Sequence, residues 1–178
     1  EKAVAIQPDY AEAHNNLGNS FLELGQLDDA VKSYEKAIDT QPDYAEAYNN
    51  LGSIFMELDQ MDDAVKSYEK ALALKPDDAD AYNKLGIVYM ELDQTDVALK
   101  CYKKALALKP DDAKAHANRG DAMKRLNLWG EALASYERAI ALNPNLDYVF
   151  NDYLHTRINL CIWDDLASHL NELTSKVN

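Results

Sequence analysis

Residues 45–78 read AEAYNNLGSIFMELDQMDDAVKSYEKALALKPDD, and their pattern predicts the architecture. Large apolar side chains recur at helical spacing in two runs, Tyr48-Leu51-Phe55-Leu58 and Met61-Val65-Tyr68-Leu72. Acids at Asp62-Asp63 stand where a second helix would begin, and they complement its dipole. Proline at Pro76 breaks the outgoing helix. The stretch therefore predicts two amphipathic helices joined by a turn.

The same pattern recurs along the chain at a constant interval. The prolines mark this period most plainly, at Pro8, Pro42, Pro76, Pro110 and Pro144. A glycine and a tyrosine recur in the same phase, at Gly18, Gly52, Gly86, Gly120 and at Tyr34, Tyr68, Tyr102, Tyr136. One helix pair cannot bury its own apolar face. A period of 34 residues, the spacing of these prolines, therefore predicts stacked helix pairs.

This pattern resembles the tetratricopeptide repeat over residues 1–146. The resemblance implies an all-α fold, a right-handed α-solenoid of helix-turn-helix repeats with a non-repeat helical cap at its C-terminal end. Because Glu1-Lys2-Ala3 matches Glu35-Lys36-Ala37, the chain is expected to begin inside the second helix of an earlier repeat. The predicted segments are a partial repeat at 1–10, four repeats at 11–44, 45–78, 79–112 and 113–146, and a degenerate capping segment at 147–178.

The repeat register is expected to fail after Pro144-Asn145, since a fifth repeat would put its glycine at Leu154. Two interpretations of this end stay open. Terminal repeats are atypical because one side meets solvent, so the segment can be a degenerate cap. Alternatively, Arg157 and the run Leu160–Asp165 resemble the joint between repeat array and catalytic region in Spindly-type O-linked N-acetylglucosamine transferases. That resemblance implies that the chain is the recognition array of a larger glycosyltransferase.

Composition excludes several classes of partner. The chain has 178 residues, 31 acids and 18 lysines and arginines, giving a formal net charge of −13. Such a balance argues against nucleic acid or an anionic membrane as partner. No apolar run approaches the roughly 18 residues of a membrane span. The two cysteines, Cys101 and Cys161, are too few for a disulfide framework and are expected as thiols in a reducing, cytoplasmic compartment.

No motif predicts catalysis, a cofactor or a metal. His14 and His116 occupy the repeat position of Tyr48 and Tyr82, which favours a packing role. His155 and His169 have no spaced ligand partners. The sequence holds no phosphate-binding glycine loop, nucleophile elbow or His-Glu-x-x-His motif. The chain itself is therefore predicted to be non-enzymatic, without a cofactor or metal.

A binding groove is the remaining candidate for function. By family resemblance, the groove residues lie on the first helix of each repeat. Asparagines recur at these positions. An asparagine amide donates and accepts hydrogen bonds, so a row of amides can hold an extended peptide by its backbone, as in the transferase family. The competing interpretation is that these residues pack between helices. The candidate partner-binding residues are Asn15, Asn16, Asn19, Asn49, Asn50, Asn83, Lys84, Asn118, Leu22, Met56 and Met90.

A carboxylate clamp, as in chaperone-binding members of the family, is not expected. The second residue of each predicted repeat faces the groove by resemblance, and these residues are Glu12, Glu46, Asp80 and Lys114. The three acids among them would repel a carboxylate. Charge also changes along the array: the first two predicted repeats each sum to −5, the third to −1 and the fourth to +2. The basic patch of Lys114, Lys124 and Arg125 suits a partner that is basic toward the N-terminal repeats. The alternative is a solubilising surface.

The sequence therefore predicts a scaffold that binds a partner protein or an extended peptide. The two hypotheses for its context are the recognition array of a larger glycosyltransferase and a stand-alone adaptor or assembly scaffold. An enzyme complete within these residues is not expected. Because apolar surface is expected at the end of the array, self-association through that end is a further expectation.

Overall fold

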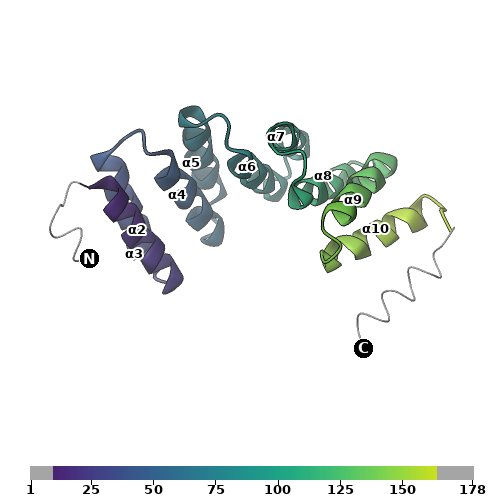
Figure 1. Ribbon diagram of the computed structural model, residues 1–178, viewed down its shortest axis with the longest axis horizontal. Coiled ribbons are helices and arrows are strands. Elements are labelled where there is room, and N and C mark those ends of the chain that lie inside the picture. Colours follow the sequence, from purple (N-terminus) through teal and green to yellow (C-terminus); the bar gives the residue numbers. More distant parts are fainter. Residues whose placement is uncertain (1–9, 164–178) are drawn as a thin grey trace. The chain divides into compact units, whose positions relative to one another are not determined.

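The computed structural model describes residues 10–163, which form helices and turns and no strand (Figure 1). The predicted all-α class is therefore confirmed for this part of the chain. The expected partial repeat before Tyr10 and the later half of the expected cap, with Asp164-Asp165 and His169, lie outside the described residues. The helices are α2 (Ala11–Glu23), α3 (Leu27–Thr40), α4 (Ala45–Glu57), α5 (Met61–Leu74), α6 (Ala79–Glu91), α7 (Thr95–Leu108), α8 (Ala113–Arg125), α9 (Trp129–Leu142) and α10 (Asp147–Asn159).

The chain divides into two compact units, Glu1–Leu108 and Lys109–Asn178. In the first unit α2 pairs with α3, α4 with α5 and α6 with α7, and α3 and α5 also pack on the first helix of the next pair. In the second unit α8 pairs with α9, and α10 packs on α9. Each pair therefore buries its apolar stripes against a neighbour, as the physics of a short helix pair requires.

Each pair is closed by a tyrosine lying on a glycine. Tyr34, Tyr68, Tyr102 and Tyr136 are almost completely buried. A Cβ atom built on the facing Gly86 would stand 2.4 Å from Tyr102 Cε1, and the other three glycines meet their tyrosines at 2.5–2.8 Å. No side chain fits at these positions, which is why glycine recurs inside an otherwise regular helix.

The turn after each first helix has a residue in the left-handed region. Gly25, Asp59, Asp93 and Asn127 have φ between 57° and 71° there. Glycine, asparagine and aspartate tolerate this conformation best among the common residues. Their backbone N–H groups bond to carbonyls of the last helical turn, such as Asp59 to Met56 at 3.2 Å. These bonds satisfy carbonyls that the helix leaves without partners.

The repeat register continues into α10, contrary to expectation. α10 begins one repeat period after α8, and Cys161, one period after Asn127, has φ 56° in the equivalent turn. The reason is that α10 packs on α9 through Val149 and Tyr153, a contact that does not use the repeat's glycine. Leu154 at that position is buried in the same cluster. Only the residues of the motif change at this end, and the first helix of a fifth pair still forms.

Replacing Cys161 with glycine is expected to stabilise the second unit. A left-handed conformation costs a residue with a Cβ atom about 1 kcal/mol, and the exposed thiol side chain contributes little packing. Thermal unfolding followed by circular dichroism should therefore show a midpoint a few degrees higher. The reverse change, Gly25→Ala, should lower the midpoint, since Gly25 has the same conformation and no atom within 4 Å of its Cβ position. An unchanged or lower midpoint for Cys161→Gly contradicts this account.

Candidate functional site

The asparagines at the fifth position of the repeat join successive first helices. Asn15 on α2 is 1% exposed, and its Nδ2 donates to Glu46 Oε1 on α4 at 3.0 Å. Asn49 on α4 repeats the arrangement, donating to Asp78 Oδ2 at 3.1 Å. Asp78 also caps α6, because its Oδ1 accepts from the N–H of Ala81. These two amides therefore position neighbouring helices instead of lying open to a ligand.

The residues at the sixth position bridge backward to the preceding first helix. Asn50 Nδ2 donates to Asn15 Oδ1 at 3.0 Å and to Asn19 Oδ1 at 3.2 Å. Lys84 does the same one pair later, donating from Nζ to Ser53 Oγ at 2.9 Å. Lys84 stands one repeat period after Asn50, and it thus bridges equivalent positions in the structure although it is not an asparagine. Together these contacts form a polar row across α2, α4 and α6 of the first unit.

Of the other candidate amides, Asn16 is exposed on α2, beside this row. Asn83 on α6 is partly buried. Asn118 on α8 is also partly buried and belongs to the second unit, so it is described separately from the row.

The ninth position receives the hydroxyl of the buried tyrosine, a link that the sequence analysis missed. Tyr34 donates to Asn19 Oδ1 at 2.6 Å, and Tyr68 and Ser53 share a hydrogen bond of 3.0 Å. Burial raises the pKa of Tyr34 and of Tyr68 to about 12, so both hydroxyls stay protonated at neutral pH. The constant spacing of 15 residues between the two positions is the signal that could have identified this contact.

The apolar candidates lie largely within the helix packing. Leu22 and Met56 pack against the buried clusters of the first unit, and Met90 is buried. Met56 Sδ also lies 3.5 Å from the Tyr68 hydroxyl that points toward it. These contacts fit the competing interpretation, in which the strip packs on neighbouring helices, better than an open apolar groove.

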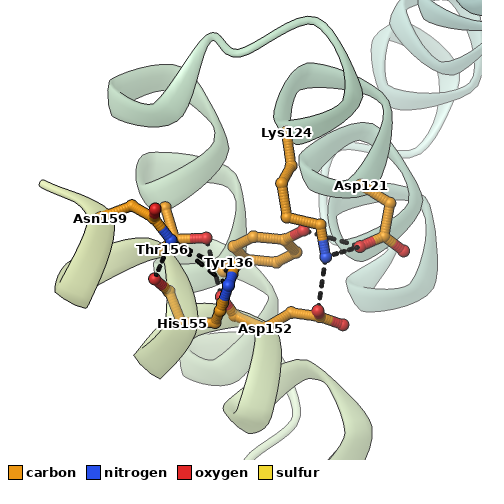
Figure 2. Close-up of polar contacts among 7 residues, drawn as sticks. All are labelled: Asp121, Lys124, Tyr136, Asp152, His155, Thr156 and Asn159. Atoms are coloured by element: carbon orange, nitrogen blue, oxygen red, sulfur yellow. Dashed lines mark hydrogen bonds and ion pairs between the residues drawn. The ribbon is translucent and has the colours of Figure 1, made fainter.

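A charged network links the helices of the second unit (Figure 2). Lys124 Nζ on α8 lies 2.5 Å from Asp152 Oδ1 on α10 and 3.8 Å from Asp121 Oδ1. The Tyr136 hydroxyl donates to the same Asp121 oxygen at 2.6 Å. Burial raises the pKa of Asp121, while Tyr136 and Lys124 oppose this rise. Lys124 is therefore engaged by two carboxylates, and the basic patch expected around it is weaker than the sequence indicates.

Figure 2 also shows how α10 holds its polar side chains close to its own backbone. Thr156 Oγ1 donates to the carbonyl of Asp152 at 2.7 Å, and Asn159 Nδ2 donates to the carbonyl of His155 at 2.8 Å. The His155 ring lies 6.1 Å from the Trp129 ring of α9, measured between centroids. His155 therefore serves in the packing of α10 on α9.

The histidines predicted to pack are both buried, and His116 Nε2 lies 3.0 Å from the carbonyl of Pro110. Burial lowers the pKa of His116, which favours the neutral ring. Within residues 10–163, no group of three or more histidine, cysteine, aspartate or glutamate side chains is placed to hold a metal ion. None of the helices in this range is both long and apolar enough to span a bilayer. Neither Cys101 nor Cys161 is in a disulfide.

Family models of the tetratricopeptide repeat match the chain along most of its length. They cover residues 1–36, 15–79, 67–100, 88–127 and 113–146. A crystal structure of MamA is 31% identical, with 80% of this chain and 84% of that chain covered and a TM-score of 0.75. The chain therefore belongs to the tetratricopeptide repeat family, and the solenoid class predicted from the period is confirmed.

Other solved structures share the fold at lower identity. MamA from Desulfovibrio magneticus RS-1, from residue 41 to its end, is 19% identical with a TM-score of 0.84, covering 93% of each chain. YrrB, described as a TPR protein with an unusual peptide-binding site, is 23% identical with a TM-score of 0.79 and covers 96% of this chain and 88% of its own. No curated protein sequence matches the chain.

Proposed function

We propose that the chain is a binding scaffold that holds an extended peptide or a segment of a partner protein. The observation that carries this proposal is the polar row across α2, α4 and α6, in which Asn50 and Lys84 each reach a neighbouring helix. YrrB, a TPR protein with an unusual peptide-binding site, has the same fold. A scaffold of this kind performs no catalysis of its own.

The contacts within the row divide its members by role. Asn15 and Asn49 position the helices, because their amides are used between them. Asn50 uses Nδ2 in its contacts, which leaves Oδ1 to accept a peptide N–H. Asn16 is exposed and offers both amide groups. We therefore propose Asn16 and Asn50 as the residues that bind the peptide backbone.

The other candidates are proposed to frame this surface. Asn19 orients Asn50, Lys84 extends the row, and Asn83 holds on α6 the repeat position of Asn15 and Asn49. Asn118 holds the repeat position of Asn50 on α8 and is proposed as a separate contact on the second unit. Leu22, Met56 and Met90 contribute whatever apolar area their packing leaves. The charge of −5 on each of the predicted repeats 11–44 and 45–78 favours a partner segment that carries lysine or arginine.

Replacing Asn16 and Asn50 together with alanine is expected to weaken peptide binding about 30-fold. Two lost hydrogen bonds of about 1 kcal/mol each account for this change. The measurement is titration calorimetry with the tightest binder from an array of extended dodecapeptides, basic and acidic. Gln41→Ala is the matched control, since it removes an exposed amide outside the row. Equal affinities of the double variant and the control would refute the proposal.

The context of the chain stays a prediction with two alternatives, the recognition array of a larger glycosyltransferase and a stand-alone adaptor. The resemblance to the transferase joint rests on Arg157 and on Leu160–Asp165. In the structure Arg157 is buried and donates to the Tyr153 hydroxyl at 2.8 Å, a contact within α10. Coding sequence after Asn178 with a few hundred residues of alternating strands and helices supports the transferase, and a stop codon supports the stand-alone adaptor.

Self-association through the end of the array also stays a prediction, which light scattering at several concentrations tests.

A further inference from the structure

A hollow of about 420 Å³ lies in the first unit between α5, α6 and α7. Leu72 of α5, Leu85 of α6, and Val97 and Cys101 of α7 form its apolar wall. Ligand sites in proteins range from about 300 to 1,000 Å³, so the hollow is large enough to receive side chains of a partner.

The α7 wall is apolar because the sequence departs from the other repeats there. The positions of Val97 and Cys101 hold Asp63 and Ser67 in α5. In α5, Asp63 pairs with a lysine and Ser67 donates to the Asp63 carbonyl at 2.8 Å, so this face is polar. α3 has the same arrangement. The change in α7 therefore replaces two polar side chains with two apolar ones.

A third departure meets the same hollow. Tyr89 of α6 lines it at a position where the first two repeats have Phe21 and Phe55. Its hydroxyl donates to Glu69 Oε1 on α5 at 3.1 Å, which joins the two helices at the edge of the hollow. Burial raises the pKa of Tyr89 to about 12 and that of Cys101 to about 11, so both groups are neutral at physiological pH.

The α7 edge of the hollow is basic. α7 carries three lysines and one aspartate, whereas α3 carries two lysines and four acids. Lys100 and Lys104 line the hollow and are exposed, and Lys104 Nζ lies 5.0 Å from the centroid of the Tyr82 ring. Glu69 on the opposite edge keeps its negative charge while it accepts the Tyr89 hydrogen bond, so the carboxylates of a partner are directed to the α7 edge and away from α5.

The hollow and the polar row lie on different sides of α6. Tyr82, Leu85 and Tyr89 follow the i, i+3, i+7 spacing of one helix face. Lys84, which belongs to the polar row, projects from another face of the helix. A ligand in the hollow therefore does not compete for the proposed peptide surface.

We propose that this hollow is a second docking site, which takes an acidic partner segment with leucine-type side chains. Its apolar side chains enter between Leu72, Val97 and Cys101, and its carboxylates meet the ammonium groups of Lys100 and Lys104. Charge complementarity on the α7 edge selects an acidic segment over a basic one.

The test uses the whole chain and a synthetic decapeptide in which two central leucines are flanked by four glutamates on each side. Val97→Asp with Cys101→Ser restores the residues of α5 and is expected to fold while losing about tenfold or more in affinity. Lys100→Gln with Lys104→Gln should lose about fivefold, and its binding should depend less on salt. Lys103→Gln removes a lysine of α7 that does not line the hollow, and it should bind like the parent protein.

Several outcomes overturn the proposal. A peptide with serines in place of the leucines, or lysines in place of the glutamates, must bind clearly more weakly than the parent peptide; equal binding contradicts the site. Equal affinity of the Val97→Asp/Cys101→Ser variant and the parent protein for the peptide also contradicts the site. If that variant instead abolishes concentration-dependent sedimentation of the protein alone, the occupant is a second copy and the partner segment is wrong. Asn16→Ala/Asn50→Ala should keep full affinity for this peptide, which separates the two sites.

Discussion

Gly86→Ala is expected to lower the unfolding free energy by about 1–2 kcal/mol, because it overpacks a filled core. The new Cβ would stand 2.4 Å from Tyr102 Cε1 and within 2.9 Å of two further ring atoms. The ring is 1% exposed and cannot move away without disturbing its neighbours. Overpacking of this kind costs about 1–3 kcal/mol or more, while alanine returns about 1 kcal/mol of helix propensity. Urea unfolding followed by circular dichroism measures the difference.

A matched control exists in the same chain. Gly130 also lies within a helix, α9, but no atom lies within 4 Å of its Cβ position. Gly130→Ala should therefore leave stability unchanged or raise it by up to about 1 kcal/mol. A second variant, Gly86→Ala with Tyr102→Leu, should recover part of the loss, because the smaller side chain makes room. If both glycine variants have the same stability, the tyrosine contact is not the reason for Gly86.

Lys124→Met is expected to lower the unfolding free energy of the second unit by about 1–2 kcal/mol at pH 7. The substitution removes the cation that lies between Asp121 and Asp152, which leaves the repulsion between the two carboxylates less compensated. The pKa of Asp121 is already raised by burial and by Asp152, and Lys124 is one of the groups that limit the rise. The variant should therefore raise this pKa further.

The sign of the pH dependence follows from that direction. An acid whose pKa is higher in the folded state binds its proton more tightly there, so it favours folding below its ordinary pKa. This contribution is lost as pH rises from the ordinary value of 3.8 through the raised one. The destabilisation by Lys124→Met should accordingly shrink as pH falls from 7 toward 4.

Thermal unfolding of parent and variant at both pH values measures this difference. Fluorescence of Trp129, whose ring contacts His155 of α10, reports whether α10 separates first. Lys114→Met is the control, because Lys114 is exposed on the same helix outside the network. A loss that is equal at pH 7 and pH 4 contradicts the shared-cation account.

The constant repeat period was enough to predict the helix pairs and the fold class. Glycine and tyrosine recur in phase because each pair needs the same close contact, as Gly86 and Tyr102 show. The motif was a poorer guide at the C-terminal end. Leu154 replaces the glycine, which suggested that the register fails, yet α10 keeps the register because Leu154 is itself buried in the cluster that α10 forms with α9.

The face of each polar residue was predictable, but its partners were not. The repeat pattern placed Asn15 and Asn50 on the first helices, and only the structure shows that their amides bond to each other. Likewise, Lys124 counted as a basic surface charge until Asp152 was found 2.5 Å away. The sequence shows that Val97 and Cys101 differ from the aspartate and serine of the earlier repeats. Only the structure shows that both side chains line one hollow.

The sequence by itself therefore determined the helices, their pairing and the side on which each residue lies. Helical periodicity reports the direction of a side chain around its own axis, and the recurring small residues report where two axes approach. The tertiary structure alone decided which amides and charges are satisfied between helices. Hydrogen bonds and ion pairs require separations of about 3–4 Å, and such distances between helices are set by packing.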